Sequence, residues 1–165
     1  MTDHEKLDHG FGPFIPEHPK YLFLGTFPSV KSLEQQFYYG HPQNIFWRLL
    51  ADIFQDDRPE SLAQKKAFLA KHGVAVYDVI ESCEIIGSSD SSIRNIVPTD
   101  IESLVQAHGI ERIIVNGRLA EKIFHQYHPK LKAYYVPSSS PANAAMTYDT
   151  KLKQWTKAVL GEDHD

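Results

Sequence analysis

Three short stretches of the sequence gather the aromatic, amide, carboxylate and hydroxyl side chains that recognition of a planar ring would need. The first covers residues 38–47, in which two adjacent tyrosines and a Gly-His-Pro turn precede Asn44. The faces of Tyr38 and Tyr39 could stack on a planar ring, and the amide of Asn44 could hold a water molecule or a polar ring atom. In the structural alternative, the tyrosines pack the loop and Asn44 caps the helix that follows.

The second stretch begins at Asp78, which ends a short apolar run. Its carboxylate could accept a hydrogen bond from a ring N–H of a purine or pyrimidine, or it could hold the loop by bonding to backbone N–H groups. Cys83 has no histidine near it in the sequence, so it is interpreted as a small core residue and not as a nucleophile.

The third stretch is Pro-Ser-Ser-Ser-Pro-Ala-Asn, residues 137–143. Serine hydroxyls and backbone N–H groups in front of a helix suit a phosphate group. The alternative is a loop that only caps the helix.

Short apolar runs that alternate with helical patterns predict the elements that must position these side chains. Because alternation of this kind produces βαβ units, we expect a three-layer α/β/α sandwich around a four-stranded parallel sheet. Ligand sites of such sheets lie outside the carboxyl ends of the strands, so the connecting loops should meet at one edge. The predicted strands are 21–25, 74–77, 112–116 and 133–136. The predicted helices are about 44–54, 60–71 (stopped by Gly73), 99–108 (with a Thr99–Glu102 capping box), 118–127, and a last one that ends near residue 160. Residues 82–98 are predicted as a polar loop.

The composition predicts one domain, residues 20–165, behind a polar, proline-punctuated arm, residues 1–19. A single cysteine excludes an internal disulfide, and the charged start of the chain is no secretory signal, so a cytoplasmic location is expected, or a nuclear one in a eukaryote. A monomer is expected as well. No stretch is apolar for long enough to cross a membrane. The net charge of −4 argues against a protein that coats DNA generally. Neither a phosphate-binding glycine fingerprint nor a metal-ligand spacing is present, so we expect no metal and no cofactor.

The motifs, in their order, resemble those of the uracil-DNA glycosylase superfamily from Tyr21 to Leu160. Gly25-Thr26-Phe27-Pro28 and the string from Tyr39 to Trp47 are similar to the first motif of the mismatch-specific members. Residues 73–78 resemble the strand that ends in the base-reading residue, and residues 137–143 resemble the last motif, which enters the minor groove. The Tyr-Tyr-Gly-His-Pro-x-Asn string and the Ser-Ser-Pro-Ala-Asn loop are most similar to the hypoxanthine-DNA (deoxyinosine) glycosylase branch.

Two positions depart from the superfamily's usual pattern. Phe27 stands where the family usually has Asp or Asn, which activates or positions the attacking water. Ser138 stands where it usually has His or Asn, which stabilises the departing base. The resemblance therefore implies a poor uracil enzyme, and it implies that the asparagine matching Asn44 matters for catalysis.

The function implied by the resemblance is a monofunctional DNA glycosylase that hydrolyses the N-glycosidic bond of a deaminated base in double-stranded DNA, hypoxanthine first and uracil second. The alternative is a catalytically silent member of the same fold that binds DNA or nucleotides, which the two departures and the acidic charge favour. A third possibility, an unrelated α/β hydrolase, is not supported, because no Ser-His-Asp order is found in the sequence. The implied site consists of catalytic Asn44 and Ser138, of base-binding Thr26, Phe27, Tyr39 and Asp78, and of the DNA contacts His41, Ser139, Ser140, Pro141, Ala142 and Asn143.

Overall fold

The computed structural model describes residues 4–8, 12–27, 37–86, 93–140 and 146–161. Its centre is a parallel four-stranded sheet in the order β3-β2-β6-β7. The strands are β2 (Tyr21–Gly25), β3 (Val74–Asp78), β6 (Arg112–Asn116) and β7 (Tyr134–Val136). The apolar runs therefore predicted the strands of this sheet correctly, because strands covered on both faces are continuously apolar.

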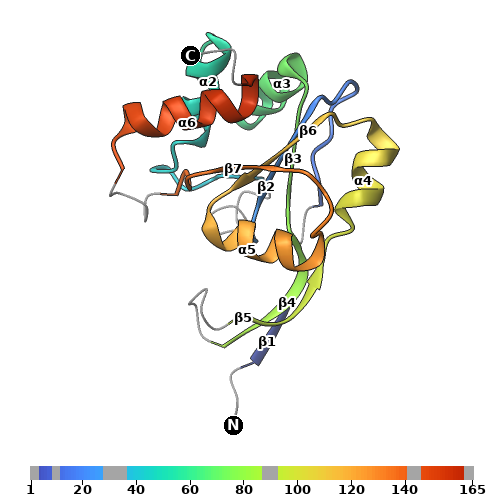
Figure 1. Ribbon diagram of the computed structural model, residues 1–165. Coiled ribbons are helices and arrows are strands. Elements are labelled where there is room, and N and C mark those ends of the chain that lie inside the picture. Colours follow the sequence, from blue (N-terminus) through green and yellow to red (C-terminus); the bar gives the residue numbers. More distant parts are fainter. Residues whose placement is uncertain (1–3, 9–11, 28–36, 87–92, 141–145, 162–165) are drawn as a thin grey trace.

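Helices cover both faces of the sheet, as predicted (Figure 1). The first face carries α2, α3 and α6, and the opposite face carries α4 and α5 (Figure 1). The bounds are Phe46–Phe54 for α2, Leu62–His72 for α3, Ile101–His108 for α4, Arg118–Tyr127 for α5 and Tyr148–Leu160 for α6. None of these helices, nor any other helical segment the structure describes, is long and apolar enough to cross a membrane.

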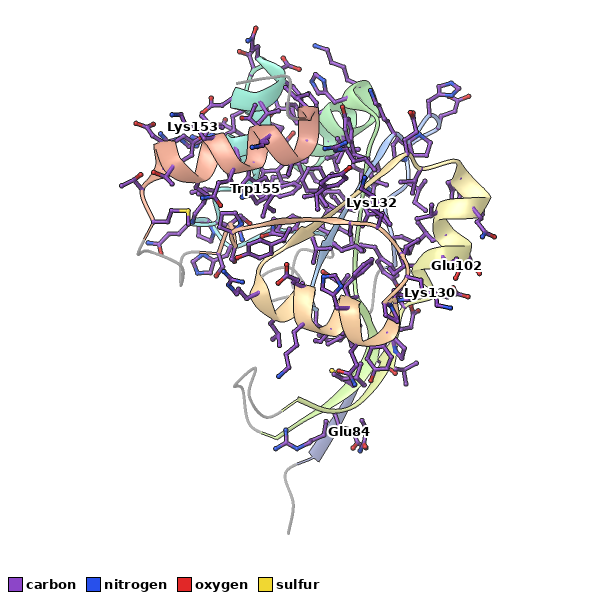
Figure 2. The ribbon with its side chains drawn as sticks, viewed as in Figure 1. Glu84, Glu102, Lys130, Lys132, Lys153 and Trp155 are labelled. Atoms are coloured by element: carbon purple, nitrogen blue, oxygen red, sulfur yellow. The ribbon has the colours of Figure 1, made fainter. Side chains whose placement is uncertain are left out.

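Phe23 lies at the centre of the core on the α2 and α6 side of the sheet. Its ring is stacked with that of Trp155 at 5.8 Å and meets Phe46 edge-on at 5.5 Å. Trp155 points from α6 towards the sheet, whereas Lys153 lies on the outer side of that helix (Figure 2). Aromatic side chains from α2, α6 and the central strand therefore join two layers of the fold.

Strand register decides which side chains end up at the carboxyl edge on this same face. Alternate residues of a strand point to the same face, so position 25 follows Phe23 towards α2. Gly25 is the register partner of Asp78. Asn116 follows Val115, the partner of Leu24, and is therefore level with Gly25. The sheet thus brings Asp78 and Asn116 to either side of a glycine, beneath the start of α2.

The prediction of a polar loop at residues 82–98 is wrong. Two strands, β4 (Ile80–Ile86) and β5 (Ile93–Pro98), pair there, and β1 (His4–Asp8) adds to the other edge of β4 in an antiparallel sheet of order β1-β4-β5 (Figure 1). The register of β4 against β5 shifts twice between Ile80 and Glu84. Such irregularities break the two-residue alternation by which a half-exposed strand is recognised in a sequence.

Two predicted helix starts also need correction. Helix α2 begins at Phe46, two residues later than predicted, with Ile45 as its N-cap residue. Helix α4 is capped by Asp100, whose carboxylate accepts the backbone N–H of Ser103 at 3.1 Å. Thr99 is not the cap, because its hydroxyl donates to the carbonyl of Asp78 at 2.7 Å. Helix α3 ends at Gly73 as predicted, with φ of 68° at the glycine.

Candidate active site

The absence of a side chain at Gly25 makes room for the carboxylate of Asp78. A Cβ atom at Gly25 would lie 2.6 Å from Oδ1 of Asp78 and 3.5 Å from the hydroxyl oxygen of Tyr39. Asp78 is only 4% exposed. The end of β2, the end of β3 and the loop before α2 therefore place a buried carboxylate and a phenol over the same point of the backbone.

Tyr39 is held in place through its ring and through its backbone. The ring lies on that of Phe46, with the ring centroids 3.9 Å apart and the planes within 14°. The indole N–H of Trp47 donates to the carbonyl of Tyr39 at 3.2 Å, which supports a left-handed backbone with φ of 53°. Because Phe46 covers one face of the ring, a base could stack only on the opposite face.

The hydroxyl oxygen of Tyr39 is buried and makes no hydrogen bond within the described residues. Burial raises the pKa of this phenol and the negative charge of Asp78 raises the pKa further, against a smaller lowering by the neighbouring side-chain amide of Asn116. The phenol is therefore neutral at ordinary pH. A buried polar atom without a partner costs free energy, and such atoms are often found where a ligand or a water supplies the missing bond.

Asn44 is not the N-cap residue of α2, as the structural alternative expected, but its side chain does bond to the start of that helix. Its Oδ1 accepts the backbone N–H of Phe46 at 3.0 Å, and its own N–H donates to the carbonyl of His41 at 2.9 Å. The half-buried side chain therefore holds the first turn of α2, although Ile45 is the cap residue. Its Nδ2 has no partner within the part of the chain that the structure describes. The amide can still donate to a water or a substrate.

The serine loop after β7 is fastened by Asn116, which the sequence reasoning did not single out. Nδ2 of Asn116 donates to the hydroxyl of Ser139 at 3.0 Å, and Oδ1 accepts the backbone N–H of Ser139 at 3.1 Å. The carbonyl of Ser139 accepts the N–H of Ile45 at 3.1 Å. The available signal was a polar residue at the end of a buried strand, directly before a glycine.

The described serines of the loop differ in their exposure. Ser139 is 1% exposed, and its hydroxyl, N–H and carbonyl all bond within the protein, so we do not propose it as a DNA contact. Ser138 and Ser140 are half-buried, and the hydroxyl of Ser138 accepts the N–H of Ser140 at 3.0 Å. Pro141, Ala142 and Asn143, predicted as DNA contacts, lie outside the described residues.

The remaining candidates lie at the same edge. Thr26 and Phe27 are half-buried directly after β2, where the carbonyl of Thr26 accepts the N–H of Ile80 at 3.2 Å and Phe27 packs against the core. His41 is half-buried, and its Nδ1 accepts the N–H of Gln43 at 3.1 Å. Cys83 is buried at 1% exposure, and burial raises the pKa of its thiol, so a core role fits it.

Two features that often mark a site do not coincide with this edge. A hollow of about 300 Å³ lies between residues 56–59 and α3, and none of the predicted site residues lines it. Within the described ranges, no three His, Cys, Asp or Glu side chains come together as a metal ion would require. The edge itself offers a neutral phenol, a carboxylate, an amide N–H and a hydroxyl, which suit recognition and hydrolysis of a ligand with a planar polar ring.

Comparison with known proteins assigns the fold to a family. Residues 12–162 match the model of the uracil DNA glycosylase superfamily. A hypoxanthine DNA glycosylase of Methanosarcina acetivorans is 33% identical over 144 residues, which cover 83% of this chain and 89% of that protein. A hypoxanthine DNA glycosylase of Methanosarcina barkeri is 29% identical over 145 residues, 87% of this chain and 82% of that protein.

A solution NMR structure from Methanosarcina acetivorans, described as that of a candidate uracil DNA glycosylase, has the same fold. It is 28% identical, superposes with a TM-score of 0.76, and covers 89% of this chain and 92% of that one. The resemblance thus spans the sheet, the helices and every loop at the carboxyl edge. The chain belongs to the uracil DNA glycosylase superfamily.

Proposed function

We propose that this DNA glycosylase removes hypoxanthine from deoxyinosine in double-stranded DNA, and uracil as a second and poorer substrate, by hydrolysing the N-glycosidic bond. The observation that carries the proposal is the buried hydroxyl of Tyr39 and the buried carboxylate of Asp78 over Gly25. It combines a stacking ring with two groups able to bond to the edge of a base. The two relatives that are hypoxanthine DNA glycosylases support the choice of base.

Recognition would begin with rotation of the target nucleotide out of the duplex, which costs least for a mispaired base. The ring of the base would stack on the face of Tyr39 opposite Phe46. The carboxylate of Asp78 would accept the N1–H of hypoxanthine. An ionised carboxylate would also oppose the negative charge that grows on the departing base, so this contact serves selection of the base more than acceleration of the reaction.

Bond cleavage would then proceed through an oxocarbenium-like sugar, which the phosphates of the DNA itself stabilise. The uncommitted Nδ2 of Asn44 would orient the attacking water without adding a charge. Ser138 would offer a neutral hydroxyl to the departing base. Phe27 brings no polar atom to the reaction, which explains why activity on uracil should be low.

The test is a duplex with a single deoxyinosine, incubated with the protein and then treated with alkali. Strand cleavage only after alkali would show a monofunctional glycosylase, because an abasic site breaks under alkali. Matched duplexes with uracil, xanthine or a thymine mismatch would rank the substrates, and the unmodified duplex is the control. If every duplex stays intact at enzyme excess, the proposal is refuted.

The second candidate function is binding of damaged DNA without cleavage. The acidic net charge of −4 and the two unusual residues, Phe27 and Ser138, favour it. This function predicts that the deoxyinosine duplex is retarded on a native gel relative to the unmodified duplex and is not cut. Retardation together with cleavage would exclude it.

A further inference from the structure

We infer that Asn116 is a positioning residue that holds Asn44 and Ser138 in fixed relation to each other; the inference rests on the proposed function. Asn116 ends β6 and is 8% exposed. Both ends of its amide bond to one residue, because Nδ2 donates to the hydroxyl of Ser139 at 3.0 Å and Oδ1 accepts the N–H of Ser139 at 3.1 Å. An amide bound in this way acts as a brace for a loop.

The brace continues into the first helix of the site. The carbonyl of Ser139 accepts the N–H of Ile45 at 3.1 Å. One chain of hydrogen bonds therefore runs from the end of β6, through the serine loop, to the start of α2. Asn44 directly precedes one link of this chain and Ser138 directly precedes another, so the two candidate catalytic residues come from separate elements but share a single support.

Close packing limits how far Ser138 can move within this arrangement. Gly117 follows Asn116 with φ of 100°, and a Cβ atom there would lie 3.4 Å from the Cβ of Ser138. The N–H of Gly117 donates to the carbonyl of Val136 at 2.9 Å, which ties the end of β7 to the same turn. The loop is therefore held against the sheet before Ser139 and at Ser139, and only the second restraint needs a side-chain amide.

The positioning role predicts a specific kinetic defect. Loss of the brace would let the loop and the start of α2 shift, and a displacement of about 1 Å can slow a reaction ~100-fold. Asn116→Ala should therefore lower the single-turnover rate on the deoxyinosine duplex by ~10- to 100-fold. The Kd for a duplex with an uncleavable abasic analogue should change by less than about threefold, since no DNA contact is removed.

Ser61→Ala is the matched control. It removes the capping box of α3, which lies outside the site, and should lower Tm with no change in the single-turnover rate. If Asn116→Ala behaves as this control does, with a lower Tm and the parent rate, Asn116 is structural only and the inference is wrong. If Asn116→Ala does not fold, Ser139→Ala removes one of the two bonds of the brace and should lower the rate in the same direction.

A double variant of Asn116 and Asn44 shows whether Asn116→Ala lowers the rate by misplacing Asn44 or by a general loss of order. In an Asn44→Ala background one of the two groups to be positioned is gone and only Ser138 remains, so adding Asn116→Ala should cost less in rate than the same change costs in the parent. Equal costs in both backgrounds would overturn the inference. A parent chain that leaves the deoxyinosine strand intact would refute the proposed function and the inference with it; an active parent with an equally active Asn116→Ala variant would refute the inference alone.

Discussion

The amide of Asn44 has one end committed to the protein and one end that is not. Oδ1 accepts the N–H of Phe46, whereas Nδ2 has no partner among the described residues. Asn44 is not the cap residue of α2, but support of the first turn of that helix and a catalytic role for the amide do not exclude each other. The bond to the helix orients the amide, and Nδ2 remains available as a donor in the same loop that carries Tyr39.

Substitutions of Asn44 should separate its two roles. Asn44→Ala should lower the single-turnover excision rate by more than about tenfold, equivalent to at least ~1.4 kcal/mol of transition-state stabilisation. Asn44→Asp keeps an oxygen for the helix, so it should keep stability within ~0.5 kcal/mol of the parent, yet it should also lose rate because it places a negative charge near the departing base. Rates come from quenched time courses at enzyme excess and stability from urea unfolding. Full activity of both variants would show that Asn44 only supports the first turn of α2.

Tyr39 permits a similar separation of ring from hydroxyl. Tyr39→Ala removes the stacking surface and should cost ~1–3 kcal/mol in excision, or ~5- to 150-fold in rate. Tyr39→Phe keeps the ring and removes a buried hydroxyl that has no hydrogen bond in the described structure. The free energy of unfolding should therefore stay unchanged or rise, by at most about 3 kcal/mol. A lower free energy of unfolding for Tyr39→Phe would show that the hydroxyl has a partner in the folded chain.

Sequence patterns located most of these residues but not their supports. Tyr39, Asn44 and Asp78 stand out because their types are unusual where they occur, at the ends of predicted elements. Asn116 occurs in an ordinary place, and its importance arises from Ser139, which lies 23 residues away in the sequence. A bond between two such distant polar side chains has no periodicity, so composition and spacing could not predict it.

At the scale of elements, the parallel sheet was predictable and the antiparallel sheet was not. Strands β2, β3 and β6 are buried along almost their whole length and are continuously apolar, which a sequence displays directly. Strands β4 and β5 carry polar side chains, and a shifted register interrupts their alternation. Their pairing is decided by contacts with each other and with β1, which no local pattern reveals.

The carboxyl ends of α2 and α3 are joined by an ionic cluster with a testable pH dependence. Asp56 follows α2, and its carboxylate lies 2.8 Å from Nε2 of His72 and 3.1 Å from Nζ of Lys71. The hydrogen bond from His72, then those from the backbone of Asp57 and from Lys71, hold the pKa of Asp56 at about 2. A lowered pKa stabilises the fold above the unfolded value of about 4, and this contribution is lost as the pH falls towards 2.

Asp56→Asn should therefore be less stable than the parent at pH 6, and the difference should shrink between pH 4 and pH 2. The amide cannot carry the negative charge that Lys71 and the ring of His72 face, whereas the parent carboxylate loses the same charge in acid. Urea unfolding of both proteins across this range measures the difference. A difference that stays constant down to pH 2 would show that the cluster acts through geometry and not through charge. Excision at neutral pH should be unaffected, because the cluster lies apart from the carboxyl edge of the sheet.

Across the whole molecule, charge and architecture place different demands on DNA binding. The chain carries a net charge of −4, so general attraction to phosphates is weak and recognition must depend on local contacts at one edge of the sheet. Arg118 opens α5 directly after Gly117 with 82% of its side chain exposed, which offers a cation beside that edge. An enzyme that must leave its product gains from weak general binding, so the acidic charge is compatible with repair.

The parallel sheet carries the candidate site residues, and we expect the antiparallel sheet to contribute to stability only. Deletion of β1 tests this expectation. Figure 1 shows that β4 begins where β3 ends and that β1, β4 and β5 project beyond that end, away from α2, α3 and α6. Deletion of residues 1–8 would remove β1 and leave one edge of β4 unpaired from Ser82 to Ile86, while β5 would still pair with the other edge. An unpaired strand edge lowers stability and recruits other chains, so the truncated protein should show a lower Tm and a larger fraction of oligomers by size-exclusion chromatography. The single-turnover excision rate of its monomer fraction should stay within about threefold of the parent, because every hydrogen bond around Asn44, Asn116 and Ser139 remains. A parent-like Tm would show that residues 1–8 are a dispensable arm. A truncated monomer that is folded but has lost its excision activity would show that the second sheet contributes to the site.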